Sequence, residues 1–289
     1  MLVTAQQLQD ERKSGDWVVF DCRFSLTDLH QGREAYLEAH IPGAWYLDLT
    51  HDLSGPVAAH GGRHPLPDVD LFAAKLSIAG VGPNTSVAVY DDGGGMATRA
   101  WWLLRYVGLD RVYVLDGGFA AWLAAGGETS REVPKPRPST FEPRVRASGV
   151  VETREVEKVV QGEKHALLVD ARAPERFRGD VEPLDPVAGH IPGARNALWS
   201  DNLTPDGYWL PADALRERFA PVVGAAGHDS AVVMYCGSGV TACANLFAMH
   251  LAGYDNAKLY AGSWSDWCSY AEHPVATGSD EHGTKSTSA

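Results

Sequence analysis

The chain has 289 residues, of which 45% are hydrophobic and 21% are charged, and its formal net charge is -12. This length predicts about two domains, and the composition is typical of a globular protein with sizeable cores. The acidic balance argues against nucleic acid or an anionic membrane surface as a partner.

The N-terminus lacks a basic region followed by an apolar one, and no apolar run approaches the roughly 20 residues of a membrane helix. The cysteines show no CxxC or zinc-ligand spacing, and few, irregularly spaced cysteines fit a reducing compartment. We therefore expect a cytoplasmic protein without a bound metal or cofactor. Three of its four cysteines are expected to be small buried core residues: Cys22, Cys243 and Cys268.

The predicted elements follow a recognisable order in the first half of the chain. A helix begins after the N-cap Thr4, and a short apolar strand ends at Asp21. A His-Ile-Pro-Gly-Ala motif occupies residues 40–44. A second apolar strand leads into Asp91, and a helix is expected over residues 98–107.

The same order returns about 150 residues later, which indicates two copies of one fold. Thr153 matches Thr4, and a strand that ends at Asp170 matches the first strand. The motif recurs at residues 190–194, a strand leads into Cys236, and a helix is expected over residues 243–252.

Each copy alternates short apolar strands with amphipathic helices, and this alternation predicts an α/β fold with a parallel sheet covered by helices on both faces. We predict a first domain over residues 1–132, a proline-rich linker over 133–148, a second domain over 149–278 and a flexible tail over 279–289. A set of tryptophans is expected to pack in the cores and between the domains rather than to form a binding cage: Trp101, Trp102, Trp264 and Trp267.

Cys236 is the strongest candidate for chemistry. It lies where a buried strand ends and a glycine-containing loop turns into a helix. Backbone N–H groups at such a junction have no partner within the helix and can bind an anion. They and the helix dipole favour the thiolate over the thiol, so this position suits a nucleophilic sulfur.

The first copy has Asp91 at the position that matches Cys236, followed by Asp92. A carboxylate offers no soft nucleophile, and the second one would repel an anionic donor. We therefore expect the first domain to be catalytically silent and to form one wall of the cleft over the loop of the second domain.

Nearly the whole chain, about residues 3 to 277, resembles the tandem-domain rhodanese superfamily of sulfurtransferases. The resemblance rests on the doubled His-Ile-Pro-Gly-Ala motif, the Asp-x-Arg strand ends, the Gly-Ser-Trp-Ser-Asp-Trp segment and the cysteine loop. The loop, Cys-Gly-Ser-Gly-Val-Thr, is similar to that of 3-mercaptopyruvate sulfurtransferases, whereas the thiosulfate version usually has two bulkier, basic residues after the cysteine.

The resemblance implies that Cys236 carries a persulfide. It implies that Arg176 binds the substrate anion and that Ser238 works with His64 and an aspartate. The loop that would hold the sulfur is formed by Gly237, Ser238, Gly239, Val240 and Thr241.

Two positions depart from the family pattern. Leu184 stands where mercaptopyruvate enzymes carry a second carboxylate-binding arginine, and Thr50 stands where the aspartate is expected, although Asp48 and Asp52 are close by. Both departures bear on the handling of mercaptopyruvate, and neither affects the persulfide.

The implied reaction is a double displacement. Cys236 takes sulfur from 3-mercaptopyruvate or thiosulfate, and a thiol, a thioredoxin-type protein or cyanide then removes it. With mercaptopyruvate the leaving enolate needs a proton, which Ser238 and His64 could relay. We expect a monomer whose partners are a small anionic sulfur donor and such an acceptor.

Four other functions are compatible with parts of this pattern. A cysteine-dependent phosphatase would need an arginine six positions after the cysteine, where this chain has Ala242, and a P-loop would need a Gly-Lys-Ser/Thr ending. The main activity could be thiosulfate:cyanide sulfur transfer. The protein could also be a persulfide carrier or partner-binding module without turnover, since one copy has lost the nucleophile.

Overall fold

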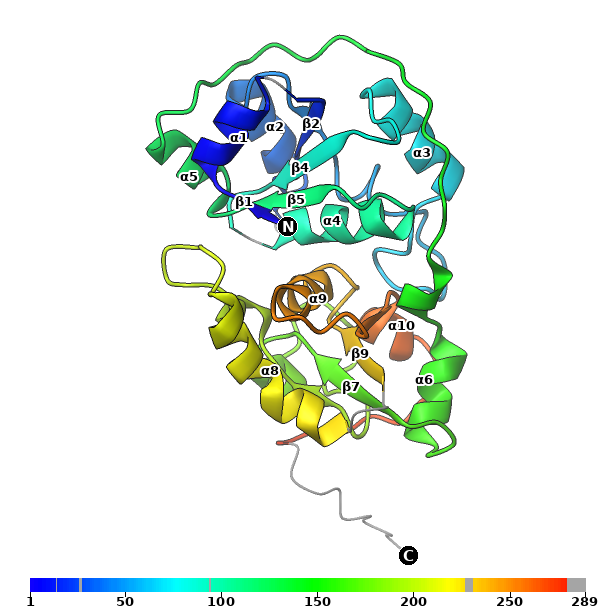
Figure 1. The fold of residues 1–289 in the computed structure, drawn as a ribbon. Coiled ribbons are helices and arrows are strands. Elements are labelled where there is room, and N and C mark those ends of the chain that lie inside the picture. Colours follow the sequence, from blue (N-terminus) through cyan, green and yellow to red (C-terminus); the bar gives the residue numbers. More distant parts are fainter. Residues whose placement is uncertain (14, 26–27, 94, 227–230, 280–289) are drawn as a thin grey trace, which may run out of the picture.

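The computed structural model describes residues 1–13, 15–25, 28–93, 95–226 and 231–279. Figure 1 shows two α/β domains, and a long connection without helix or strand passes around the first domain to reach the second. Of the predicted tail, only residue 279 is among the described residues. Within that part of the chain, none of the helices combines the length and the apolar character that a membrane span requires.

Each domain contains a five-stranded parallel sheet, and the two sheets have the same strand order. The order is β1-β5-β4-β2-β3 in the first domain and β6-β10-β9-β7-β8 in the second. The first sheet consists of β1 (Leu2–Val3), β2 (Trp17–Asp21), β3 (Trp45–Tyr46), β4 (Ser86–Tyr90) and β5 (Val112–Leu115). The second consists of β6 (Val150–Val151), β7 (Ala166–Asp170), β8 (Arg195–Asn196), β9 (Ala231–Tyr235) and β10 (Lys258–Tyr260).

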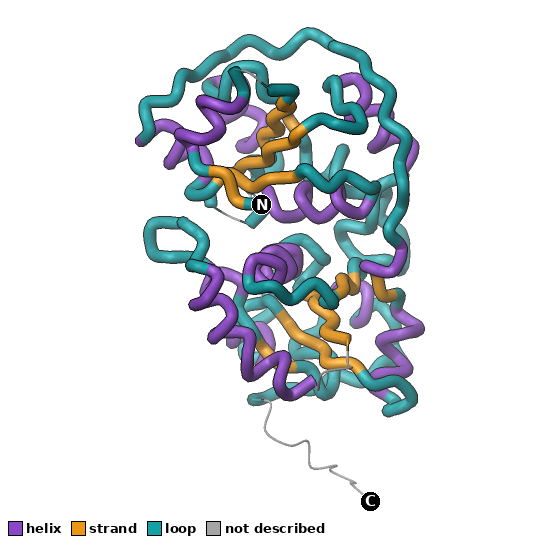
Figure 2. The backbone as a smooth tube through the Cα atoms, in the orientation of Figure 1, coloured by secondary structure: helices purple, strands orange, loops and turns teal. Residues whose placement is uncertain are grey.

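Helices cover both faces of each sheet, as the sequence predicts (Figure 2). The first domain contains α1 (Ala5–Glu11), α2 (Gln31–Glu38), α3 (Val69–Ile78), α4 (Met96–Tyr106) and α5 (Gly118–Ala124). The second contains α6 (Thr153–Val160), α7 (Pro174–Arg178), α8 (Ala212–Ala226), α9 (Ala242–Leu251) and α10 (Ser263–Trp267), with 3-10 turns at Ala147–Gly149 and Trp199–Asn202.

The helix starts show where the two copies diverge. Thr4 is the N-cap of α1, as predicted, and it forms a capping box with Gln7. The matching prediction for Thr153 is wrong by one residue, because Glu152 is the N-cap of α6. Thr153 is the first helical residue, and its hydroxyl donates to Asp266 at 2.5 Å.

The two domains share one hydrophobic core. Side chains of a strand alternate between the two faces of a sheet, so Val87 and Val89 of β4 face one core while Ala88 and Tyr90 face another. The core on the first face continues into the second domain, where it includes Val232 and Met234 of β9 and most of α9.

Helices α4 and α9 pack against each other across the domain boundary. Trp101 of α4 packs edge-on against Phe247 of α9, with ring centroids 4.9 Å apart. Trp101, Trp102, Trp264 and Trp267 are all buried, in agreement with the packing role expected for them. Since α9 follows the cysteine loop directly, this contact fixes the first domain beside that loop.

Candidate active site

Cys236 follows the last residue of β9 and is 2% exposed. The backbone N–H of Gly239 donates to its sulfur at 3.2 Å. Four further N–H groups of the loop have no acceptor among the described residues, those of Gly237, Ser238, Val240 and Thr241. This free set of donors, at the start of α9, can hold the negative charge of a thiolate or a persulfide.

Gly239 is required by the shape of the loop. Its φ is +76°, in the left-handed region, and a Cβ at this position would lie 2.3 Å from the carbonyl oxygen of Ala261. Both the conformation and the close approach exclude a side chain. Only glycine can therefore occupy this position, and its N–H donates the hydrogen bond to the sulfur of Cys236.

The segment after β10 holds the cysteine loop from the other side. Trp264 N–H donates to Cys236 O, and Ser265 N–H donates to Gly237 O, both at 2.9 Å. The hydroxyl of Ser263 accepts from Cys236 N–H at 3.1 Å and donates to Tyr260 O. Ser263 has a φ of 55°, and it is the one non-glycine residue with a positive φ in the described ranges. This strained conformation places its hydroxyl at the nucleophile.

The first domain contributes His64 to the site. Its Nδ1 lies 2.8 Å from Oγ of Ser238, so the two residues are hydrogen-bonded across the domain boundary. Burial, with the positive charges of Arg99 and Arg63, lowers the pKa of His64 to about 4. The imidazole is therefore neutral at neutral pH and can accept a proton from the serine hydroxyl.

Neither nearby aspartate completes a triad with this pair. Asp48 accepts hydrogen bonds from the N–H groups of Thr50 and His51, and Asp52 forms an ion pair with Lys75 at 2.9 Å. Within the described ranges, no carboxylate contacts His64. Thr50 itself is exposed, so the aspartate position of the family pattern has no substitute here.

Two arginines from different domains flank the loop. A Cβ on Gly237 would lie 3.0 Å from Nη2 of Arg63 and 3.5 Å from Nη1 of Arg176. Both arginines line a cavity of about 200 Å³ that also contains Cys236 and Leu184. Sequence reasoning identified Arg176 and missed Arg63, whose only signal was its position next to His64.

Carboxylates of the protein form ion pairs with these arginines. Glu182 accepts from Arg176 Nη2 at 2.5 Å and from its Nε at 3.2 Å. Asp185 pairs with Arg176 at 3.3 Å and also with Arg63, so it bridges the two guanidinium groups. The nitrogens nearest Gly237, Nη2 of Arg63 and Nη1 of Arg176, have no hydrogen-bond partner among the described residues and can bind a substrate anion.

Asp91 shows what the matching loop does in the first domain. One carboxylate oxygen accepts from the N–H of Gly93 at 2.6 Å, and the other accepts from the N–H of Ala97 at 2.8 Å. The loop and the start of α4 thus bind an anion that is part of the protein. This arrangement fits the expectation that the first domain is catalytically silent.

Two segments, residues 4–125 and 152–270, match the family of rhodanese-like domains. The chain belongs to the rhodanese family. This rhodanese is 49% identical over 280 residues to a probable 3-mercaptopyruvate sulfurtransferase of Pseudomonas aeruginosa. The match covers 96% of this chain and 98% of the Pseudomonas protein. The chain is 39% identical over 282 residues to a putative thiosulfate sulfurtransferase, SseB, of Mycobacterium tuberculosis, which covers 96% and 97% of the two chains.

The fold comparison agrees with the sequence comparison. The crystal structure of SseA from Escherichia coli, described as a 3-mercaptopyruvate sulfotransferase, matches this rhodanese with a TM-score of 0.78. The two are 31% identical, and the match covers 91% of this chain and 98% of that one. The resemblance and the α/β fold expected from the sequence are confirmed, and the chain is a sulfurtransferase.

The three other cysteines of this rhodanese differ in their burial. Cys22 and Cys243 are buried, as expected, but Cys268 is partly exposed. Burial raises the pKa of Cys243 to about 12, so its thiol stays protonated. In the part of the chain that the structure describes, no group of three or more His, Cys, Asp or Glu side chains could hold a metal ion.

Proposed function

We propose that this rhodanese transfers the sulfur of 3-mercaptopyruvate through a persulfide on Cys236. The observation that carries the proposal is the 2.8 Å hydrogen bond between His64 and Ser238, two residues from the cysteine. Release of pyruvate requires a proton shift, whereas release of sulfite from thiosulfate requires none. A neutral imidazole bonded to a serine hydroxyl is suited to that shift. The name of the Pseudomonas relative supports the same donor.

Arg63 and Arg176 would bind the carboxylate of the donor. A guanidinium grips a carboxylate through parallel hydrogen bonds, and both groups lie beside Gly237 at the mouth of the loop. Arg63 of the first domain would then replace the second arginine of the family pattern, which is absent at position 184. Asp185 already shows that a single carboxylate fits between the two.

The first half of the reaction moves the sulfur of mercaptopyruvate to Cys236. The Cys236 thiolate attacks the sulfur of mercaptopyruvate, an S–S bond forms, and the C–S bond breaks. Its electron pair leaves with the carbon as the pyruvate enolate. The proton of the substrate thiol passes to Ser238 and His64 and then to that carbon, which yields pyruvate. The free N–H groups of the loop would stabilise the negative charge of the persulfide.

In the second half of the cycle, a nucleophile of the acceptor, either a thiolate sulfur or the carbon of cyanide, attacks the outer sulfur, the S–S bond breaks, and Cys236 leaves as a thiolate. Reduced thioredoxin, a small thiol or cyanide fits this step. Thiosulfate is the second candidate donor, because the same arginines can bind its sulfonate and the Mycobacterium relative is named for it. The acceptor, the monomeric state and the cytoplasmic location stay predictions.

The deciding experiment compares kcat/KM for mercaptopyruvate and for thiosulfate in the wild type, Ser238→Ala and His64→Ala. We expect the wild type to prefer mercaptopyruvate. Both substitutions should reduce its use by about 100-fold, the scale of a lost proton-transfer catalyst, with a much smaller effect on thiosulfate. Equal losses for the two donors would refute the relay.

A further inference from the structure

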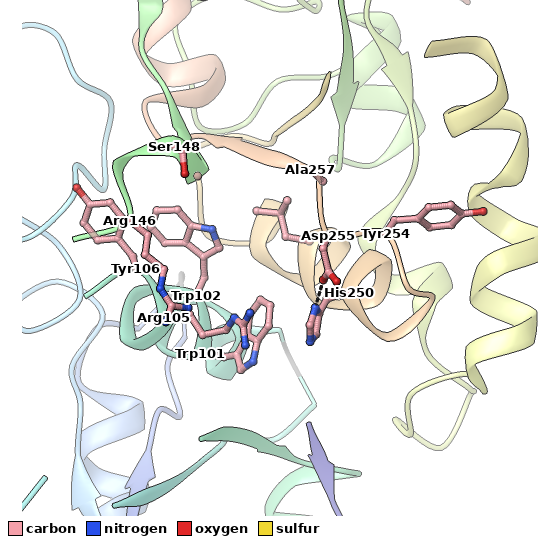
Figure 3. A pocket seen from close by; sticks show the side chains of 12 residues that line it. Trp101, Trp102, Arg105, Tyr106, Arg146, Ser148, His250, Tyr254, Asp255 and Ala257 are labelled. Atoms are coloured by element: carbon pink, nitrogen blue, oxygen red, sulfur yellow. Dashed lines mark hydrogen bonds and ion pairs between the residues drawn. The ribbon is translucent and has the colours of Figure 1, made fainter. Parts of the chain in front are cut away.

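A second cavity of about 190 Å³ lies between the domains at the other ends of α4 and α9. The cysteine loop leads into the start of α9, whereas this cavity is lined by Trp101, Trp102 and Arg105 of α4, His250 of α9, Arg146 and Tyr254. Figure 3 shows the side chains of α4 on one side and those of His250 and Tyr254 on the other. It shares no lining residue with the active-site cavity.

From this geometry we propose that the inter-domain cavity binds a small organic anion, a carboxylate on a flat or apolar body. The proposal goes beyond the sulfur-transfer site, because none of the residues that line this cavity takes part in it. Three features support it: an arginine with free donors, a buried indole N–H without an acceptor, and aromatic walls.

Arg105 is the anchor for the anion. Among the described residues its one hydrogen bond is from Nη1 to the sulfur of Met1 at 3.1 Å, and no carboxylate lies within ion-pair distance. A guanidinium has five N–H donors, and a thioether is a weak acceptor, so most of these donors are available. Burial and the positive charge of Arg146 lower the pKa of Arg105, and the more distant carboxylates of Asp110 and Asp255 offset only part of this shift, so a bound anion would add to their effect.

Trp101 adds a second, independent signal. The residue is 3% exposed, and its indole nitrogen has no hydrogen-bond partner among the described residues. A buried indole N–H normally has an acceptor, because leaving it unpaired costs about 1–3 kcal/mol. The structure provides no acceptor from the protein, which is the expected state of a donor that serves a ligand.

The walls define the rest of the ligand. The guanidinium of Arg105 lies 5.3 Å from the ring centre of Trp101, and Trp102 stacks on Tyr106 at 5.1 Å. The volume equals about six water molecules at roughly 30 Å³ each, which suits a single ring. Asp255 also lines the cavity, on the side opposite α4, and its carboxylate is paired with His250 (Figure 3).

Benzoate is the probe for this site, and its uncharged analogue benzamide is the control ligand. Titration calorimetry should show saturable benzoate binding below about 10 mM and at least tenfold weaker binding of benzamide. Arg105→Gln should weaken benzoate binding about tenfold or more, and Trp101→Phe, which keeps a ring but removes the N–H, about threefold or more. Arg33→Gln, an exposed charge on α2, should change nothing.

Arg176→Gln separates this site from the sulfur-transfer site and should leave benzoate binding unchanged. If Arg176→Gln and Arg105→Gln weaken binding equally, benzoate is in the active site and the proposal is wrong. Absence of saturable binding to the wild type also overturns it. Should Arg105→Gln fail to fold, as judged by its melting curve, Trp101→Phe and the benzamide comparison still decide.

Discussion

Arg99 of α4 donates a hydrogen bond to the carbonyl oxygen of Gly239, 3.2 Å away across the domain boundary. The same guanidinium donates to the carbonyl oxygens of Leu53 and His64, at 3.2 and 3.1 Å. Arg99 is completely buried, and among the described residues no carboxylate pairs with it. One positive charge of the first domain thus connects the cysteine loop to the segment that carries His64.

Replacing Arg99 should weaken the nucleophile as well as the fold. In Arg99→Gln we expect alkylation of Cys236 by iodoacetamide to require a higher pH, because a buried positive charge near the thiolate is lost. Sulfur transfer should fall about tenfold or more, and stability by about 2–4 kcal/mol from unpaired carbonyls. Alkylation rates against pH and urea unfolding measure these effects. An unchanged alkylation profile with reduced stability would show a purely structural role.

Arg99→Lys is the matched control, because it keeps the charge but not the fork of donors. It should restore most of the alkylation profile while remaining less stable than the wild type. Arg33→Gln removes an exposed charge on α2, which does not line the active-site cavity, and should behave as the wild type.

The fold could be predicted from the sequence because its signals are local and occur in both copies. The strand that leads into Asp91 and the one that leads into Cys236 were predictable from short apolar runs, and so was the position of the cysteine loop. Arg63 and Arg99 were not predictable. They act on a loop more than 100 residues away along the chain. The packing of α4 against α9 brings Arg99 there, and the hydrogen bonds of the Gly61 and Arg63 N–H groups to Asp266 and Ser265 bring Arg63 there.

The surroundings of Arg176 show the same limit. A resemblance places this arginine at the substrate, but no local pattern shows that Glu182 and Asp185 neutralise it in the folded chain. The positive φ of Ser263 is similarly hard to predict, because serine rarely adopts it, and the one signal is the glycine at the matching position of the first copy, Gly118, with a φ of 59°.

The imidazole of His64 should titrate near pH 4, which NMR of its ring protons can follow. Burial is the main cause, and Arg63 and Arg99 add to it. A histidine in the unfolded chain has a pKa of about 6.5, so folding disfavours the protonated form of His64. The stability that the neutral imidazole contributes is therefore fully present above about pH 6.5 and is lost as the pH falls from there toward 4. Arg63→Gln should raise the pKa of His64. A wild-type midpoint at pH 6 or above would contradict the burial that the structure shows.

Ser263 can be tested with two substitutions that both remove its hydroxyl. Ser263→Ala keeps a side chain at a φ of 55°, whereas Ser263→Gly relieves that strain. Both variants lose the hydrogen bond to Cys236 N–H, so both should transfer sulfur about three- to tenfold more slowly. The glycine variant should nevertheless be more stable than the alanine variant by about 1 kcal/mol in urea unfolding. Wild-type rates in either variant would show that the hydroxyl does not position the nucleophile.

The two buried cysteines near the loop should behave differently. Intact-mass spectrometry after incubation with mercaptopyruvate should show one added sulfur in the wild type and in Cys243→Ser, and none in Cys236→Ser. The thiol of Cys243 donates to Gly239 O at 3.3 Å, and its raised pKa keeps it from acting as a nucleophile. Cyanide should remove the added sulfur. Sulfur that remains on the Cys236→Ser protein would place the carrier elsewhere.

Asp185 should compete with the donor for the two arginines that it bridges. Arg63→Gln and Arg176→Gln are each expected to raise KM for mercaptopyruvate about tenfold or more, because each removes a charge-assisted contact to its carboxylate. Asp185→Asn keeps the shape of the side chain but removes its negative charge. We therefore expect it to lower KM, since the arginines lose their internal partner.

The sign of this last effect distinguishes two roles for the same ion pairs. If Asp185 serves mainly to orient Arg63 and Arg176, its loss would leave the guanidinium groups misplaced, and KM would rise as it does in the arginine variants. If it occupies the place of the substrate carboxylate, KM falls and kcat changes little, because Cys236, Ser238 and His64 are untouched. Asp180→Asn, the same change at an exposed carboxylate that does not line the cavity, is the matched control and should leave both constants near the wild-type values.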